Sequence, residues 1–184
     1  MAKIDILAPF ILSFEGGYAN DKDDKGGATK HGVTLATWRA NGYDKNGDGR
    51  IDEKDVMQIT EADAIRIMKK NFWDVWQADL IHCQSLANIL VDWVWASGKY
   101  GITIPQEMLG VKPDGKVGPK TLEALNKQDS WQFFQKLKVR RKKYLQDIVK
   151  ARPKNYKYLK GWQRRLDGIR YGSLVYNSGK EVRF

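Results

Sequence analysis

A glutamate that follows an apolar helical stripe is the first residue in this 184-residue chain whose type and position suggest chemistry. The apolar spacing predicts a helix from Lys3 to Phe14, with one face formed by Ile4, Leu7, Ala8 and Ile11. The next position on that face is Glu15, and Gly16-Gly17 then end the helix and leave space for a bulky ligand. A carboxyl kept partly away from water holds its proton more readily, which suits a general acid for glycoside cleavage. The alternative is a glutamate at a helix end that faces solvent.

The polar, glycine-rich stretch that follows contains candidates for a second catalytic group. Asp24 lies nine residues after Glu15, and Thr29 lies five residues after Asp24. Glycoside hydrolysis commonly needs a second oxygen group across the sugar, which holds or activates water or stabilises an oxocarbenium-like transition state. Asp24 and Thr29 are suitably placed for this role, while Asp21 and Asp23 compete with Asp24. Each aspartate is alternatively an ordinary solvated loop residue.

A separate loop over residues 44–55 has the spacing of an EF-hand calcium loop. Oxygen-bearing side chains occupy its positions 1, 3 and 5, and a glycine occupies position 6. The expected ligands are Asp44, Asn46, Asp48, the carbonyl of Arg50, Asp52 and Asp55. Position 12 is Asp55 instead of the usual bidentate glutamate. We expect a structural calcium ion that pins the loop; the alternative is a turn rich in Asp, Asn and Gly without metal.

Two aromatic residues flank the candidate active loop. Tyr18 and Trp38 are therefore candidates for stacking on sugar rings. Four other tryptophans lie in apolar helical stretches and are expected in the core, namely Trp73, Trp76, Trp93 and Trp95. Asp92 lies within an apolar run, so we expect it to be buried and either to cap a neighbouring helix or to bond to the active loop.

Composition and charge limit the class of protein and its partners. Hydrophobic residues form 42% of the chain and charged residues 29%, as in a soluble globular protein. No apolar run approaches the roughly 20 residues that a transmembrane helix needs. The net charge of +10 is concentrated in residues 131–170, which carry 14 Lys or Arg and two acids. This basic segment predicts a polyanionic partner, such as nucleic acid, an anionic cell envelope or acidic lipid.

The chain-long pattern predicts a mainly α fold because strand-like alternation is scarce. Helices are expected over 34–40, 60–73, 84–97, 103–109, 119–125, 130–150 and 158–170, and a loop or small β-hairpin over 18–33. Thr60 and Asp63 have the spacing of a capping box. The almost wholly apolar segment 84–97 is expected to be the central buried helix.

Two sequence motifs resemble glycoside hydrolase family 108, a family of lysozyme-like N-acetylmuramidases that includes putative secretion activators and phage endolysins. The first is FEGGY at residues 14–18, followed by NDKDDKGGATKHGVT. In that family the glutamate of EGGY is taken as the catalytic acid, which corresponds to Glu15. The order Glu15, Asp24, Thr29 is also similar to the catalytic triad of phage-type lysozymes, although one residue shorter before the threonine.

The second motif, PDGKVGPKT at residues 113–121, resembles a signature in the peptidoglycan-binding-like half of this family. Alternatively, the motif has a structural role alone, in which Pro-Asp-Gly forms a tight turn and Gly-Pro begins a helix. The resemblance implies a lysozyme-like catalytic lobe over residues 1–97, which includes the calcium loop, and a helical, basic, peptidoglycan-binding-like lobe over 98–184. We expect the two lobes to form one compact unit.

The resemblance implies a peptidoglycan hydrolase that cleaves the β-1,4 bond between N-acetylmuramic acid and N-acetylglucosamine, with Glu15 as general acid. The expected partners are peptidoglycan glycan strands and the anionic cell envelope, and no motif for specific nucleic acid recognition is present. The expected place of action is the bacterial cell wall, in the periplasm or outside the cell, although the first residues do not form a signal peptide. A lytic transglycosylase is a close variant. A non-catalytic wall-binding or secretion-assisting protein with a lysozyme-like fold is the alternative from another class.

Overall fold

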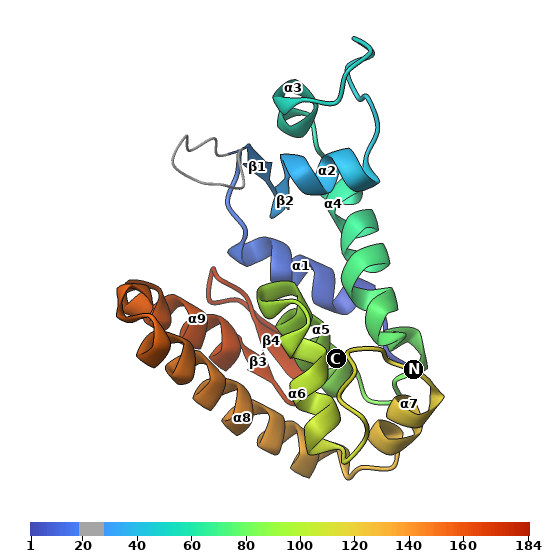
Figure 1. Cartoon of the computed structure of the whole chain (residues 1–184), viewed down its shortest axis with the longest axis vertical. Helices are drawn as coiled ribbons and strands as arrows, with labels where there is room; N and C mark the ends of the chain where they lie inside the picture. Colours follow the sequence, from blue (N-terminus) through green and yellow to red (C-terminus); the bar gives the residue numbers. More distant parts are fainter. Residues whose placement is uncertain (19–27) are drawn as a thin grey trace.

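The computed structural model describes residues 1–18 and 28–184, and this part of the chain is mainly helical with two small antiparallel sheets (Figure 1). Helix α1 (Ile4–Phe14) buries Leu7, Ala8, Phe10 and Ile11, which confirms the apolar face predicted from spacing. The helix ends at Glu15, whose backbone is extended. None of the helices in the described part of the chain is long and apolar enough to cross a membrane.

Residues 28–67 form a small lobe with its own apolar cluster (Figure 1). Strands β1 (Thr29–Lys30) and β2 (Val33–Thr34) form the hairpin, and α2 (Leu35–Asn41), α3 (Glu53–Met57) and α4 (Glu61–Met68) follow. Thr34 caps α2, and reciprocal capping boxes begin α3 and α4. The second of these boxes is the predicted one, in which Thr60 and Asp63 each bond to the other's backbone N–H. These caps satisfy backbone donors at helix starts and so fix where each short helix begins.

The larger lobe is built around α5 (Gln84–Ser97), ten of whose residues are buried. Helices α6 (Tyr100–Met108) and α8 (Ser130–Ala151) pack against it. The chain from α4 to α5 passes through η1 (Lys69–Trp73), η2 (Asp74–Trp76) and η3 (Ala78–Leu80). The predicted helix over 60–73 is therefore α-helical only to Met68, and η1 continues it as a π-helix.

The C-terminal part differs from the all-helical expectation. After α7 (Pro119–Asn126), α8 and η4 (Pro153–Asn155), helix α9 (Tyr156–Gly168) ends two residues earlier than predicted. A three-stranded antiparallel sheet follows, in the order β3 (Ile169–Arg170), β4 (Ser173–Val175), β5 (Glu181–Arg183). Leu174 pairs with Ile169 on one side and Val182 on the other, and its side chain is fully buried.

One apolar core runs through most of the molecule outside the small lobe. It extends from Leu7 in α1, through α5, to Phe134 in α8 and Leu174 in β4. Helix α5 ends at Gly98, which has a positive φ of 56° and stands at the predicted division between the two lobes. Apolar residues on both sides of that position belong to the same core.

Candidate active site

Glu15 lies where the end of α1 faces the larger lobe. Its backbone N–H donates to the carbonyl of Leu12 at 3.1 Å, and its side chain is 20% exposed. Carboxylate Oε1 accepts two hydrogen bonds, one from Trp95 Nε1 at 2.9 Å and one from Arg165 Nη1 at 2.9 Å. The carboxyl is therefore held in one orientation by α5 and α9, as a reactive group requires.

Arg165 links Glu15 to a buried acid on the central helix. Its Nε and Nη2 both donate to Asp92 Oδ1, at 2.9 and 2.7 Å. Asp92 is fully buried, and its Oδ2 accepts from Arg141 Nη2 at 2.7 Å. Burial alone would raise the pKa of the Asp92 carboxyl, but the charges of Arg165 and Arg141 outweigh this effect and hold that pKa below its usual value. Asp92 is thus buried as predicted, and among the described residues it pairs with two arginines, one of which, Arg165, also bonds to Glu15.

The β1–β2 turn closes over the other oxygen of Glu15. Gly32, in this turn, has a φ of 75°, and a Cβ placed on it would lie 3.0 Å from Glu15 Oε2 and 2.6 Å from the Trp95 ring. Trp95 is held in turn by Phe72, whose ring centroid lies 4.7 Å away. Phe72 belongs to the π-helix η1, a type of segment that often occurs at functional sites. Residues of both lobes therefore lie against the Glu15 carboxyl, Gly32 from the small lobe and Trp95 from the larger one.

The structure places two of the residues that were predicted to act together with Glu15. Thr29 lies in β1, on the hairpin whose turn contacts Glu15 through Gly32. Tyr18 is 39% exposed and follows Glu15 by three residues, so its ring is accessible to a ligand. Asp24 lies outside the described residues. Its role and that of Thr29 stay predictions.

Trp38 is wrongly predicted as a sugar-stacking residue. Its side chain is fully buried in the small lobe, where its Nε1 donates to the Tyr43 carbonyl at 3.1 Å. The Tyr43 ring packs on it with a centroid distance of 5.5 Å. An indole with no accessible face cannot stack on a sugar, and Trp38 serves as the central residue of the small core.

The predicted calcium loop turns through hydrogen bonds between its own side chains and backbone. Asp44 Oδ1 accepts from Gly47 N and its Oδ2 from Gly49 N, both at 2.7 Å. Both glycines have positive φ, 77° and 86°, which only glycine adopts without cost. Asn46 Oδ1 accepts from Asp48 N at 2.8 Å. Asp44, Asn46 and Asp48 are hard oxygen donors of the kind that calcium prefers.

Asp55 differs from the other predicted ligands because it is fully buried. Its oxygens accept from the backbone N–H groups of Lys45, Asn46 and Asp52. Burial would raise the pKa of Asp55, but these donors hold that pKa below its usual value. Asp52 Oδ1 accepts from Lys54 N at 2.8 Å and caps α3. Among residues 1–18 and 28–184, no three His, Cys, Asp or Glu side chains gather as a metal cluster. The donor chemistry fits calcium at positions 1, 3 and 5, whereas Asp55 is occupied in closing the loop.

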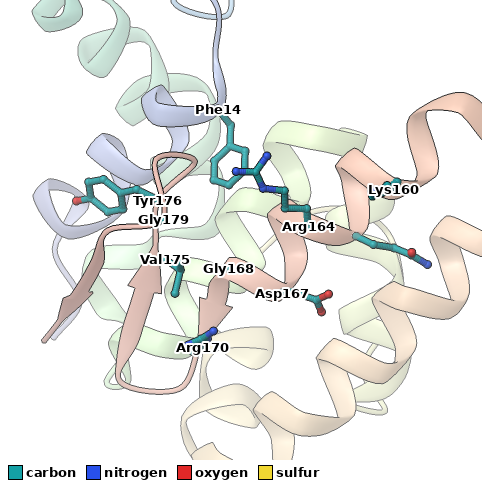
Figure 2. Close-up of a pocket in the computed structure, with 10 residues that line it drawn as sticks. Phe14, Lys160, Arg164, Asp167, Gly168, Arg170, Val175, Tyr176 and Gly179 are labelled. Carbon is teal, nitrogen blue, oxygen red and sulfur yellow. The ribbon is translucent and has the colours of Figure 1, made fainter.

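A basic cavity adjoins the end of α1 on the side of α9 (Figure 2). Its volume is about 460 Å³, and Phe14 lines it although Glu15 does not. Three cationic side chains and one acid are among its lining residues, Lys160, Arg164, Arg170 and Asp167. The charged side chains of its lining therefore carry a net positive charge, which favours an anionic ligand.

A helical protein with a partly buried glutamate between a hairpin-bearing lobe and a larger helical lobe has the architecture of a lysozyme-like glycosidase. Residues 8–98 match the family described as glycosyl hydrolase 108, and residues 100–167 match a predicted peptidoglycan domain. The chain therefore carries a glycosyl hydrolase 108 domain followed by a predicted peptidoglycan domain, as its motifs predicted. These domains indicate a glycoside hydrolase that acts on peptidoglycan.

The fold is also similar to a solved structure, SagA of Brucella abortus. The two chains are 28% identical, each is covered over 90% of its length, and the TM-score is 0.73. No curated protein sequence matches the chain.

Three residues of the site are absent from the sequence prediction. Arg165 is one of 14 basic residues in its segment, and nothing in the local pattern distinguishes it. Trp95 was expected in the core because its helix is apolar, yet its indole N–H reaches Glu15. Gly32 could have been singled out by the HG dipeptide after GGATK, because a glycine in a short turn often marks a positive φ.

Proposed function

We propose that the protein is a peptidoglycan hydrolase that cleaves the β-1,4 bond between N-acetylmuramic acid and N-acetylglucosamine, with Glu15 as its general acid. One observation carries the proposal. Glu15 of the hydrolase domain lies partly buried between the lobes, with its carboxylate oriented by Trp95 and Arg165. Such a carboxyl can deliver a proton to a bound glycoside without the cost of reorganising in water.

The bond cleavage needs one proton donor and one water. Oε1 of Glu15 holds the two hydrogen bonds, so Oε2, beside Gly32, is the oxygen that carries the proton. The proton passes to the glycosidic oxygen as the bond from that oxygen to the muramic acid C1 breaks. Water adds to C1, and its proton is released to a base. Asp24 is the candidate base or stabiliser of the developing cation, and Thr29 is the candidate for holding the water.

The remaining features supply substrate attraction and support. Tyr18 is the candidate for sugar stacking. The basic segment 131–170, which includes most of α8 and α9, would attract the anionic envelope over a long range, so the protein acts at the bacterial cell wall. A calcium ion on Asp44, Asn46, Asp48, the Arg50 carbonyl and Asp52 would stiffen the small lobe and take no part in bond cleavage, while Asp55 closes the loop.

To test the reaction, the purified protein is incubated with peptidoglycan sacculi and the released muropeptides are identified by mass spectrometry. We expect reducing muramic acid ends from the wild type, and a loss of at least about a hundredfold for Glu15→Gln, because general acid catalysis contributes about 10²–10⁴-fold. Glu123→Gln removes the same charge at an exposed position on α7 and is the matched control.

The other outcomes separate the alternatives. Anhydro-muramic ends would make the protein a lytic transglycosylase. No release from folded wild type would contradict the enzyme and favour a wall-binding protein. Asp24→Asn and Thr29→Ala in the same assay identify the second group, since the variant that loses turnover carries it.

A further inference from the structure

The partner of Glu15 comes from the other domain of the chain. Glu15 lies in the hydrolase domain, residues 8–98, whereas Arg165 lies on α9 within the predicted peptidoglycan domain, residues 100–167. Their ion pair, Arg165 Nη1 to Glu15 Oε1 at 2.9 Å, therefore connects the two domains at the candidate catalytic carboxyl.

Arg165 is held on several sides before it reaches Glu15. Two of its nitrogens, Nε and Nη2, bond to Asp92, and its guanidinium lies 5.6 Å from the centroid of the Phe14 ring. Asp92 is fixed by Arg141, which is 4% exposed and also donates to the Ile89 carbonyl. The result is a chain of alternating charges, Arg141, Asp92, Arg165 and Glu15, that runs from the core to the site.

This arrangement is a costly way to stabilise a fold. Each buried ion must lose its hydration, and well-packed apolar residues commonly stabilise a protein as well as a buried ion pair does. What a buried charge network supplies is a fixed orientation of its last member. Only an arginine fork can present one edge to Asp92 and a third nitrogen to Glu15 at the same time.

We infer that Arg165 is a positioning residue for Glu15, so that the predicted peptidoglycan domain completes the catalytic centre as well as serving any binding role. The inference rests on the proposed function of Glu15. Arg165 fixes the carboxyl through Oε1 and leaves Oε2 for the glycosidic oxygen, and Asp92 balances the positive charge that Arg165 brings to the site. Arg165 itself makes no contact with the reacting atoms.

The test compares Arg165→Lys, Arg165→Met and Arg183→Met with the wild type. Arg183 is exposed on β5 and lies outside residues 131–170, so its variant makes the same change in charge without altering the segment proposed to attract the substrate. Soluble glycan strands of peptidoglycan serve as substrate, and kcat, KM and the melting temperature are measured for each protein.

We expect Arg165→Lys to fold, because its ammonium still pairs with Asp92, and to lose at least about tenfold in kcat with KM changed less than about threefold. Arg165→Met is expected to lose more kcat than Arg165→Lys, again with little change in KM, because it also removes the pair with Asp92 that holds the side chain. Arg183→Met keeps the wild-type kcat and KM.

A folded Arg165→Lys protein with wild-type kcat would overturn the inference, whether or not Arg165→Met folds. A fall in kcat that disappears when each variant is assayed well below its melting temperature would also overturn it, since that result indicates a structural role alone. Wild-type activity of Glu15→Gln would instead contradict the proposed role of Glu15 as general acid. Failure of the Arg165 inference and failure of the proposed function therefore give different results.

Discussion

Gly32 and Glu15 touch across the two lobes, and this contact allows no side chain on the glycine. The turn carries two consecutive positive φ values, 51° at His31 and 75° at Gly32. The missing Cβ leaves room for both the Trp95 ring and Oε2 of Glu15. At Gly32 the small lobe therefore approaches the carboxyl through backbone alone.

Gly32→Ala tests this contact. The added methyl would lie 2.6 Å from the Trp95 ring, and alanine at positive φ costs about 1–2 kcal/mol. We expect a lower melting temperature and at least about a tenfold loss of muropeptide release, since displacement of the carboxyl disturbs its alignment. Gly161→Ala on α9, where a Cβ meets nothing within 4 Å, is the control and should keep both. Wild-type behaviour of Gly32→Ala would contradict the packing described here.

At the residue scale, the sequence predicts what is local and misses what is distant. Glu15 follows from the helical spacing of its own segment and from the EGGY motif. Arg165 could not be found in this way, because it meets Glu15 across 150 positions and only the fold brings them together. Trp38 was misplaced because the sequence does not show which face of a short helix lies against the small core.

At the scale of elements, loop 44–55 connects α2 to α3 and closes on itself. Lys45, which follows Asp44, pairs with Asp63 at 2.8 Å, and Asp63 caps α4. Asp63 and Asp55 thus fix the loop to the starts of two helices. Any stiffening of the loop would reach α3 and α4 and, through them, the hairpin above Glu15.

Calcium titration measures whether the loop binds a metal. We expect one calcium per chain by isothermal titration calorimetry and a rise in melting temperature, because a ligand that binds only the folded state stabilises it by mass action. Asp44→Asn with Asp48→Asn should abolish both effects, while Asp147→Asn on α8 should not. Chelation should lower stability with little effect on the chemical step. Absence of heat and of any thermal shift would contradict the calcium proposal.

The elements themselves were predictable to different degrees. Helical periodicity correctly identified α1, α5 and α9, which carry the site, and the Thr60–Asp63 capping box correctly identified the start of α4. The sheet of β3, β4 and β5 was missed because its strands are two or three residues long. Such strands are too short to show an alternating pattern of apolar and polar residues. The turn at Gly172, with a φ of 78°, was the available signal. The π-helix η1 was also missed, since its sequence keeps the helical pattern of α4.

At the scale of the molecule, the two matched domains share one core. Leu90 of α5, Phe134 of α8 and Leu174 of β4 belong to the same apolar cluster, and Asp92 takes both of its arginine partners from the second domain. Neither domain has a complete interior without the other.

A fragment of residues 1–98 should therefore not fold on its own. It would expose the apolar faces of α5 and leave Asp92 without Arg141 and Arg165, and loss of the partners of a buried charge costs about 3–5 kcal/mol. Circular dichroism during heating and limited proteolysis compare the fragment with the full chain. A cooperative thermal transition and resistance to protease in the fragment would show that the hydrolase domain is independent.

The ion pair between Glu15 and Arg165 also has a consequence in time. The ribosome adds about 5–20 residues per second, so 150 positions separate the synthesis of these two residues by roughly 8–30 s. During that interval a nascent chain carries the glutamate but not the arginine that orients it. A chain interrupted before Arg165 has been added lacks the ion pair, and its Glu15 carboxyl stays without that orientation.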